Sequence, residues 1–206
     1  YMEINNFYTL TVYEKGAAVV GMIHSLLGDE KFRQGSDLYC SRHDGQAVTI
    51  EEFVGAMEEV SGKDLKQFRR WYKQSGTPQV EVESHYDAQA KTYSLSFSQS
   101  CPATPRQSHK QPFVIPIKLC LVGADGEDLV LNKQGEQSIV FSLYDTSQTL
   151  VFENIQQPPV PSLLRGFSAP IKLNYAYTSA QLAHLMAHDS DGFNRWDAGQ
   201  KLSLLV

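Results

Sequence analysis

The sequence has few cysteines, and none of them forms a Cys-Xaa-Xaa-Cys pair. Cys40, Cys101 and Cys120 are odd in number and far apart, which is not the pattern of a disulfide framework and indicates reduced thiols. Reduced thiols in turn predict a cytoplasmic protein. Residues 1–3 also lack the charged and apolar pattern of a secretory leader, so no signal peptide is expected.

An excess of basic residues and a long apolar run are missing as well. The net charge is −5 and the isoelectric point is near 5.7, whereas a nucleic-acid surface needs a basic field. No apolar run approaches the roughly 20 residues that a membrane helix requires. We therefore expect no nucleic-acid partner and no membrane partner. With 42% hydrophobic and 20% charged residues, the composition is that of an ordinary globular protein.

Common catalytic motifs are absent too. The sequence contains no His-Glu-Xaa-Xaa-His, no Gly-Xaa-Ser-Xaa-Gly and no Gly-rich phosphate loop. His184 and His188 have the spacing that places two metal ligands on one helix face. However, Leu185 stands where the glutamate base would follow His184, and no third ligand is evident. We interpret the two histidines as partly exposed helix residues and expect no metal site in this chain.

Residues 13–74 have the hydrophobic spacing of α-helices. Thr49 and Glu52 form a capping box at the start of one predicted helix, which ends at Gly62. Asp64 is placed to cap a further helix. The charged residues of that helix lie opposite its apolar face and are expected to be solvated; they are Lys66, Arg69, Arg70 and Lys73.

Apolar and polar residues then alternate, as they do in half-buried strands. Turn residues separate the apolar segments, and Pro158 to Pro161 is assigned to one of these turns. Short strands at this spacing predict an antiparallel β-sandwich. The six expected strands lie within residues 80–84, 93–97, 113–122, 138–144, 149–152 and 171–175.

Helical spacing returns after Tyr177, with Ser179 and Asp191 as the expected N-caps of two helices. A helix pair this short cannot bury its own apolar face, which implies more protein beyond it. The predicted fold class is therefore α+β: helices, then a β-sandwich, then the first helices of another helical unit.

Several blocks, in order along the whole chain, resemble one known family. Val12-Tyr13-Glu14-Lys15-Gly16 looks like the tyrosine motif of the gluzincin aminopeptidases, the aminopeptidase N family, and the longer block 5–16 resembles its bacterial branch. The family's zinc motif and its amine-recognising Gly-Xaa-Met-Glu-Asn segment do not occur here, so the resemblance implies an internal piece of a zinc aminopeptidase. The similarity continues through Arg-His-Asp-Gly (42–45), Phe-Arg-Arg-Trp-Tyr (68–72), Gln-Ser-Gly-Thr-Pro (74–78), Pro-Ala-Thr-Pro (102–105), Phe-Ser-Ala-Pro (167–170) and Phe-Asn-Arg-Trp-Asp (193–197).

The resemblance implies roles for three residues. Tyr13 matches the family tyrosine whose O–H donates to the oxygen of the tetrahedral intermediate. Glu14 would face the amine end of the substrate, and Tyr8 would line the substrate pocket. The residues alone favour a strand-to-helix junction with one packed tyrosine, with a helix from residues 14–16 onward. In that reading Glu14 is a first-turn residue favoured by the helix dipole, and Tyr8 is a packing residue.

The resemblance also implies three domains. Residues 1–76 would be the C-terminal helical part of a thermolysin-like catalytic domain, 77–177 a β-sandwich linker domain, and 178–206 the start of a helical C-terminal domain. The parent enzyme would use zinc to remove N-terminal amino acids from peptides, whereas this chain by itself is expected to bind no zinc and to be inactive. The alternative hypothesis is a non-catalytic binding module, a β-sandwich flanked by helices.

Overall fold

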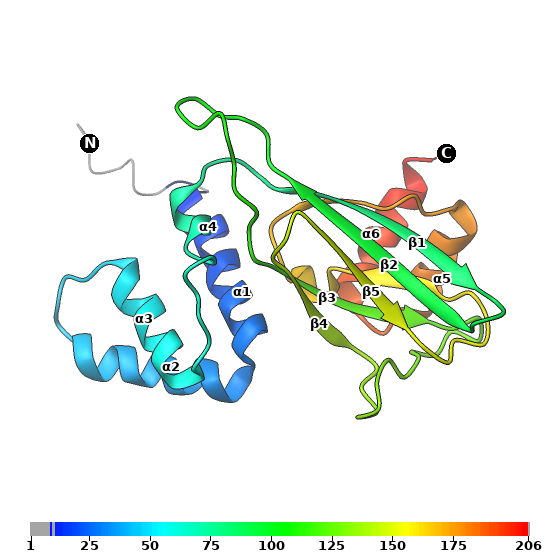
Figure 1. The fold of residues 1–206 in the computed structure, drawn as a ribbon, viewed down its shortest axis with the longest axis horizontal. Helices are drawn as coiled ribbons and strands as arrows, with labels where there is room; N and C mark the ends of the chain where they lie inside the picture. The colour runs from blue at the N-terminus through cyan, green and yellow to red at the C-terminus, as the bar shows by residue number, and fades with distance from the viewer. Residues whose placement is uncertain (1–8, 10, 206) are drawn as a thin grey trace. The chain divides into compact units, whose positions relative to one another are not determined.

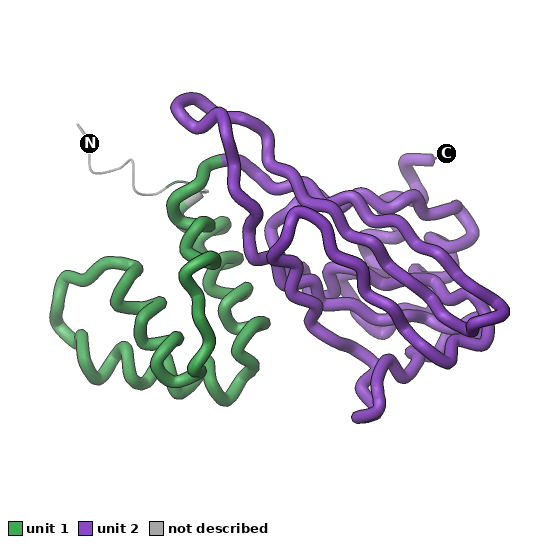
Figure 2. Tube along the Cα trace, in the orientation of Figure 1, with its two compact units in different colours: residues 1–75 green, residues 76–206 purple. Residues whose placement is uncertain are grey.

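A computed structural model describes residue 9 and residues 11–205 of the chain, and for Thr11 the backbone alone. It divides into two compact units, Tyr1–Ser75 and Gly76–Val206 (Figure 2), which are described separately. No helix in the described part of the chain is long and apolar enough to cross a membrane.

The first unit is helical (Figure 1). A π-helical turn, η2 (Thr11–Lys15), leads into α1 (Gly16–Leu27), and α2 (Asp29–His43), α3 (Ile50–Ser61) and the short α4 (Arg70–Lys73) follow. Apolar residues at helical spacing face inward, as the periodicity predicts. The buried core of this unit contains Val19, Met22, Ile23, Val54, Ala56, Met57, Leu65, Phe68 and Trp71.

Both predicted ends of α3 are confirmed. The side chain of Thr49 and that of Glu52 form the capping box at its start. At its end, Gly62 adopts a left-handed conformation with φ 68°, and its N–H donates to the carbonyl of Glu58 at 2.8 Å. Glycine adopts this conformation without the steric cost that a Cβ would add, which is why it ends the helix.

The helix expected after Asp64 is much shorter than predicted. The carboxylate of Asp64 accepts a hydrogen bond from the N–H of Lys66 at 2.7 Å, as a cap does. Residues 66–69 nevertheless form turns, and α4 has only four residues.

Arg69 is not on a solvated face, so that part of the prediction is wrong. Its side chain is only 15% exposed and forms ion pairs with two carboxylates of α3. Two guanidinium nitrogens, Nη1 and Nη2, lie 2.8 and 2.9 Å from the carboxylate oxygens of Glu58, and Nε lies 2.5 Å from Glu51. A charge withdrawn from water needs such partners, and these ion pairs join this segment to α3. Lys66 and Lys73 are exposed, as predicted.

The second unit is a β-sandwich followed by two helices (Figure 1). One sheet has the strand order β5-β2-β1-β7 and the other β4-β3-β6. Neighbouring strands are antiparallel except that β7 runs parallel to β1. The predicted sandwich is confirmed. Its strands are β1 (Gln79–Asp87), β2 (Thr92–Ser100), β3 (Ile115–Val122), β4 (Ile139–Leu143), β5 (Ser147–Phe152), β6 (Val160–Leu163) and β7 (Lys172–Asn174).

The alternation in β2 has the predicted sense. Tyr93, Leu95 and Phe97 are buried between the sheets, whereas Ser96 and Ser98 are exposed. Because successive side chains of a strand point to opposite faces, one set fills the core and the other stays solvated.

The turn predicted at Pro158 to Pro161 is partly wrong, because β6 begins at Val160. Pro161 is paired with Leu121 in β3. Proline cannot donate a ladder hydrogen bond, but β6 is at the edge of its sheet, where proline is tolerated. The proline-rich sequence therefore suggested a turn where an edge strand begins.

The chain ends with α5 (Ser179–His188) and α6 (Gly192–Ser203). The N-cap of α5 is Thr178 rather than Ser179, because Thr178 forms a capping box with Gln181. Asp191 caps α6, as predicted. The two helices pack on the sandwich through an apolar cluster of Val122, Leu182, Leu185 and Ala198, joined by Val160, Tyr177 and Leu202.

The described residues contain no disulfide. Cys40 is exposed and Cys120 is buried. Burial raises the pKa of the Cys120 thiol to about 12, so this thiol stays protonated and unreactive.

Candidate functional site

The tyrosine motif lies in the first turn of a continuous helical segment. Lys15, at the junction of η2 and α1, has right-handed helical angles of φ −68° and ψ −36°, so the π turn continues into α1 without a break. The N–H groups of Val12 and Tyr13 donate to the carbonyl of Thr9 at 3.0 and 3.1 Å. The helical conformation thus begins at Thr11, before the junction that the sequence indicated.

Tyr13 projects from this turn and does not belong to the core. Its side chain is 56% exposed, and Glu14 beside it is also exposed. The prediction of a packed tyrosine at a junction is therefore not supported for Tyr13. A π turn within a helix occurs frequently at functional sites, and a tyrosine on a helical segment can present its hydroxyl to a ligand with little loss of conformational freedom.

The position of Glu14 does not distinguish between its two predicted roles. It lies in η2, at the beginning of the helical segment, where the helix dipole favours a carboxylate. Its exposed side chain is equally able to meet a cationic amine. Consecutive helix residues do not face each other, so Glu14 and Tyr13 would contact different parts of a ligand. Tyr8 lies outside the described residues, and its role stays a prediction.

His184 and His188 contact a loop of the sandwich. Nε2 of His184 lies 2.8 Å from the carbonyl oxygen of Gly123, and the two imidazole rings are 4.8 Å apart. The ring of His188 covers Gly126, where a Cβ would collide with it. These contacts are those of residues that dock α5 on the loop after β3. Gly126 also has a φ of 88°, so both its space and its backbone favour glycine.

The described residues do not fit a zinc ion. No group of three or more His, Cys, Asp or Glu side chains among them is arranged to hold a metal, whereas a zinc site needs three or four protein ligands. Zinc chemistry in a parent enzyme would therefore depend on residues that are not in this described set.

A hollow of about 1090 Å³ opens in the second unit between residues 123–134 and 151–157. Its charged residues, Asp125, Lys133 and Glu153, are of both signs. Tyr13 and Glu14 belong to the other unit, so this hollow is separate from the tyrosine motif.

The sequence interpretation missed two ionic clusters, one around Arg69, which is 15% exposed, and one around Arg165, which is 5% exposed. Arg69 pairs with Glu58, 11 residues away in the sequence. Arg165 pairs with Asp128 and Asp189, which are 37 and 24 residues away. No local spacing connects partners so far apart, so only the folded chain reveals them.

Three family models match the chain in succession. The peptidase family M1 domain matches residues 1–72. The domain of unknown function DUF3458, with an Ig-like fold, matches residues 76–176, and DUF3458_C, a domain of unknown function with ARM repeats, matches residues 179–206. The order of an enzyme domain, a β-sandwich and a helical array agrees with the predicted fold class.

Relatives of known name align with nearly the whole chain. Aminopeptidase N of Escherichia coli strain K12 is 50% identical over 202 residues, and aminopeptidase N of Haemophilus influenzae is 46% identical over 202 residues. Each alignment covers 98% of this chain but 23% of the relative. The chain thus spans about a quarter of the length of these relatives.

A solved structure shows the same arrangement of elements. The crystal structure of Legionella pneumophila aminopeptidase A in complex with aspartic acid superposes with a TM-score of 0.86 and 31% identity, over 98% of this chain and 22% of that chain. Together with the succession of family models and the 50% identity to an aminopeptidase N, this places the chain in the aminopeptidase N family, peptidase family M1, as a segment of a longer protein.

Proposed function

We propose that this chain is part of a cytoplasmic, zinc-dependent aminopeptidase that removes N-terminal amino acids from peptides. The observation that carries the proposal is the 50% identity to an aminopeptidase N over 202 residues, an alignment that spans the exposed Tyr13. The Legionella relative was crystallised with aspartic acid. A free amino acid is what an aminopeptidase releases, so that complex is consistent with the proposed reaction.

In this proposal Tyr13 is a catalytic residue. Attack on the peptide carbonyl places negative charge on the tetrahedral oxygen, and the O–H of Tyr13 donates a hydrogen bond to it. A phenol stays protonated at neutral pH and offers one aimed donor. Such a donor accelerates the reaction because its hydrogen bond strengthens as the charge develops.

Glu14 and Tyr8 would bind the substrate. Glu14 accepts hydrogen bonds from the protonated N-terminal amine, which selects peptides with a free N-terminus. Tyr8 lines the pocket around the first residue of the substrate. The exposed position of Glu14 next to Tyr13 supports this division of roles.

The remaining parts of the site would come from other domains of the parent. No group of three or more His, Cys, Asp or Glu side chains among the described residues could hold the zinc, so the 206-residue chain is expected to be inactive by itself. We assign residues 1–76 to the end of the catalytic domain, 77–177 to a β-sandwich linker and 178–206 to the start of a helical domain. The linker would hold the two helical domains around the site.

The proposal is tested with the full-length parent enzyme and a matched pair of peptides. The free peptide should be shortened from its N-terminus, whereas the same peptide with an acetylated N-terminus should stay intact. A chelator should abolish the activity, and zinc should restore it. If purified full-length protein binds the free peptide but releases no amino acid, the alternative of a non-catalytic binding module is correct.

A further inference from the structure

Arg165 is a buried cation in the second unit. Its side chain is 5% exposed, and it lies in a 3₁₀ turn, η3 (Arg165–Phe167), that follows β6. Leu164, just before this turn, and Phe167, its last residue, have left-handed φ angles of 58° and 54°. Non-glycine residues adopt this conformation only where the surrounding structure holds them. A strained turn thus directs the guanidinium inward rather than into water.

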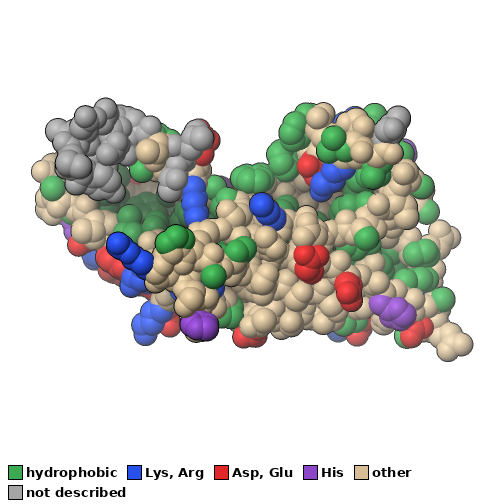
Figure 3. Space-filling view, turned by 90° about the horizontal axis from the view of Figure 1, so that it is seen from above, with side chains coloured by type: hydrophobic (Ala, Val, Ile, Leu, Met, Phe, Trp, Pro, Cys, Tyr) green, Lys and Arg blue, Asp and Glu red, His purple; other side chains and the backbone are tan. Residues whose placement is uncertain are grey.

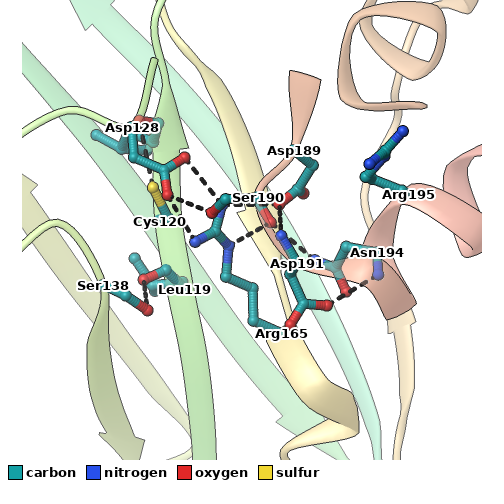
Figure 4. A network of polar contacts seen from close by, with 12 residues as sticks. Leu119, Cys120, Asp128, Ser138, Arg165, Asp189, Ser190, Asp191, Asn194 and Arg195 are labelled. Atoms are coloured by element: carbon teal, nitrogen blue, oxygen red, sulfur yellow. Dashed lines mark hydrogen bonds and ion pairs between the residues drawn. The ribbon is translucent and has the colours of Figure 1, made fainter. Parts of the chain in front are cut away.

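One side of the guanidinium binds the sandwich (Figure 4). Nη1 and Nη2 of Arg165 lie 2.9 and 3.0 Å from the two carboxylate oxygens of Asp128, in the segment after β3. Nε donates to the hydroxyl of Ser162 in β6 at 2.9 Å. Burial alone would raise the pKa of Asp128, but the hydrogen bond from Arg165 lowers it, so the carboxylate stays charged. The bidentate pair fixes the plane of the guanidinium.

The other side of the same guanidinium binds the helix pair. Nη2 of Arg165 donates to Asp189 at 2.7 Å, and Asp189 is a 2% exposed residue in the connection between α5 and α6. The same oxygen of Asp189 accepts the N–H of Asp191, the N-cap of α6, at 2.9 Å. Arg165 therefore contacts the sandwich and the start of α6 at the same time.

Two neutral side chains extend this connection. Ser190 donates its hydroxyl to Asp128 at 2.6 Å. The amide nitrogen of Asn194, in the first turn of α6, lies 2.8 Å from the hydroxyl of Ser162 and 2.9 Å from the carbonyl of Leu163. These two side chains thus join the helix pair to β6 and to the segment after β3.

The polar cluster around Arg165 and the apolar cluster have different effects on the helix pair. The apolar cluster consists of Val122, Leu182, Leu185 and Ala198. Apolar burial favours contact but has no direction. A buried ion cluster gains little net stability, because desolvation of the charges offsets their attraction, but its bidentate hydrogen bonds are directional. The angle of the helices on the sandwich should therefore depend on the ions rather than on the apolar contacts.

We propose that Arg165, with Asp128 and Asp189, sets the orientation of the α5–α6 pair on the β-sandwich. Arg165 is then a positioning residue for the helical array that begins with these helices. The array would keep its attachment without Arg165 but would lose its fixed angle.

The test measures orientation and stability separately in the 206-residue chain. Spin labels are placed at Ser98→Cys on β2 and Gln200→Cys on α6, both exposed positions, after Cys40 and Cys101 are replaced by serine. Arg165→Met leaves the buried carboxylate of Asp189 and the 14% exposed one of Asp128 without their cation, so amide exchange in α5 and α6 should accelerate at least about 100-fold. The distance distribution between the labels should also broaden.

The triple variant Arg165→Met, Asp128→Asn and Asp189→Asn separates the effect on orientation from the effect on stability. It removes all three charges, so slow amide exchange should largely return while the distance distribution stays broad. Arg195→Met, an exposed arginine on α6 that donates to the carbonyl of Met186 in α5 at 3.3 Å rather than to the sandwich, is the matched control and should leave the distance distribution unchanged. A distribution as narrow as that of the wild type in the triple variant would overturn the proposal, even if Arg165→Met alone fails to fold.

Discussion

At the scale of single residues, the sharpest prediction concerns Tyr13 in the full-length enzyme. Tyr13→Phe keeps the ring and removes only the hydroxyl. The loss should be a factor of roughly 100 to 1,000 in kcat, with KM nearly unchanged, because the hydrogen bond strengthens only in the transition state. Steady-state kinetics at confirmed zinc occupancy measures both constants.

Tyr8→Phe is the control for Tyr13→Phe. Whether Tyr8 lines the substrate pocket or packs in the fold, loss of its hydroxyl should lower kcat much less than loss of the Tyr13 hydroxyl does. Full turnover of the Tyr13→Phe enzyme, with zinc content and folding intact, would remove the catalytic role of Tyr13.

A second residue-scale prediction concerns Glu58 and acid stability. The hydrogen bond from Arg69 lowers the pKa of Glu58 below its ordinary value near 4.5. A lowered pKa in the folded state contributes stability above pH 4.5, and this contribution is lost as the pH falls through the folded value. Glu58→Gln should therefore lower the free energy of unfolding at pH 7 by about 1–3 kcal/mol and flatten its dependence on pH below 4.5.

Urea unfolding at several pH values measures this effect, and Glu59→Gln is the matched control. Glu59 pairs with Arg42, but both side chains are about half exposed, so water screens the pair and its removal should matter less. Equal effects of the two substitutions would show that the low exposure of Arg69 has no influence.

At the scale of elements, the two capping boxes make a paired prediction. Thr49 caps α3 in the first unit and Thr178 caps α5 in the second. Replacement of either threonine by alanine should lower the stability of its own unit by about 1 kcal/mol, because one helix N–H loses its acceptor. Replacement by serine should have almost no effect.

Native-state hydrogen exchange assigns each loss to a helix. Thr49→Ala should accelerate exchange in α3 and leave α5 unchanged, and Thr178→Ala should do the reverse. If alanine and serine variants behave alike at both positions, the side-chain caps do not contribute.

At the scale of the whole molecule, apolar side chains remain on the surface of the described residues (Figure 3). Phe167, Phe193 and Trp196 form one aromatic cluster, with ring centroids 5.7 and 5.8 Å apart, and Trp196 is 59% exposed. Exposed clusters of this kind mark surfaces that are covered by other protein. The isolated chain should self-associate, and Trp196→Ser should shift sedimentation velocity profiles toward the monomer.

The exposed Tyr144, elsewhere in the second unit, provides the comparison. Tyr144→Ser should leave self-association unchanged, because Tyr144 follows β4 of the sandwich and is not one of the three residues of this cluster. A chain that is already monomeric at high concentration would contradict the prediction.

Metal content is a further property of the whole chain. Because the described residues hold no suitable ligand group, the dialysed 206-residue chain should contain far less than one zinc per molecule by elemental analysis. His184→Ala should not change that value. Stoichiometric zinc that disappears in the His184→Ala variant would show that the two histidines of α5 bind metal after all.

The sequence by itself determined the features that depend on neighbouring residues. The caps at Thr49 and Asp191 and the helix end at Gly62 follow from local hydrogen bonds and from backbone freedom. The alternation in β2 follows from the two-residue period of a strand. The resemblance of the motif around Tyr13 to a known family could likewise be identified from the sequence, because its residues are consecutive.

The tertiary structure decided what depends on distant partners. Arg69 and Arg165 resemble surface residues until the fold brings carboxylates from far along the chain to them. Pro161 resembles a turn residue until β6 takes the edge of a sheet. Exposure of Tyr13 also required the fold. Burial and pairing are properties of the assembled chain, since charges and apolar faces acquire their partners only when distant segments meet.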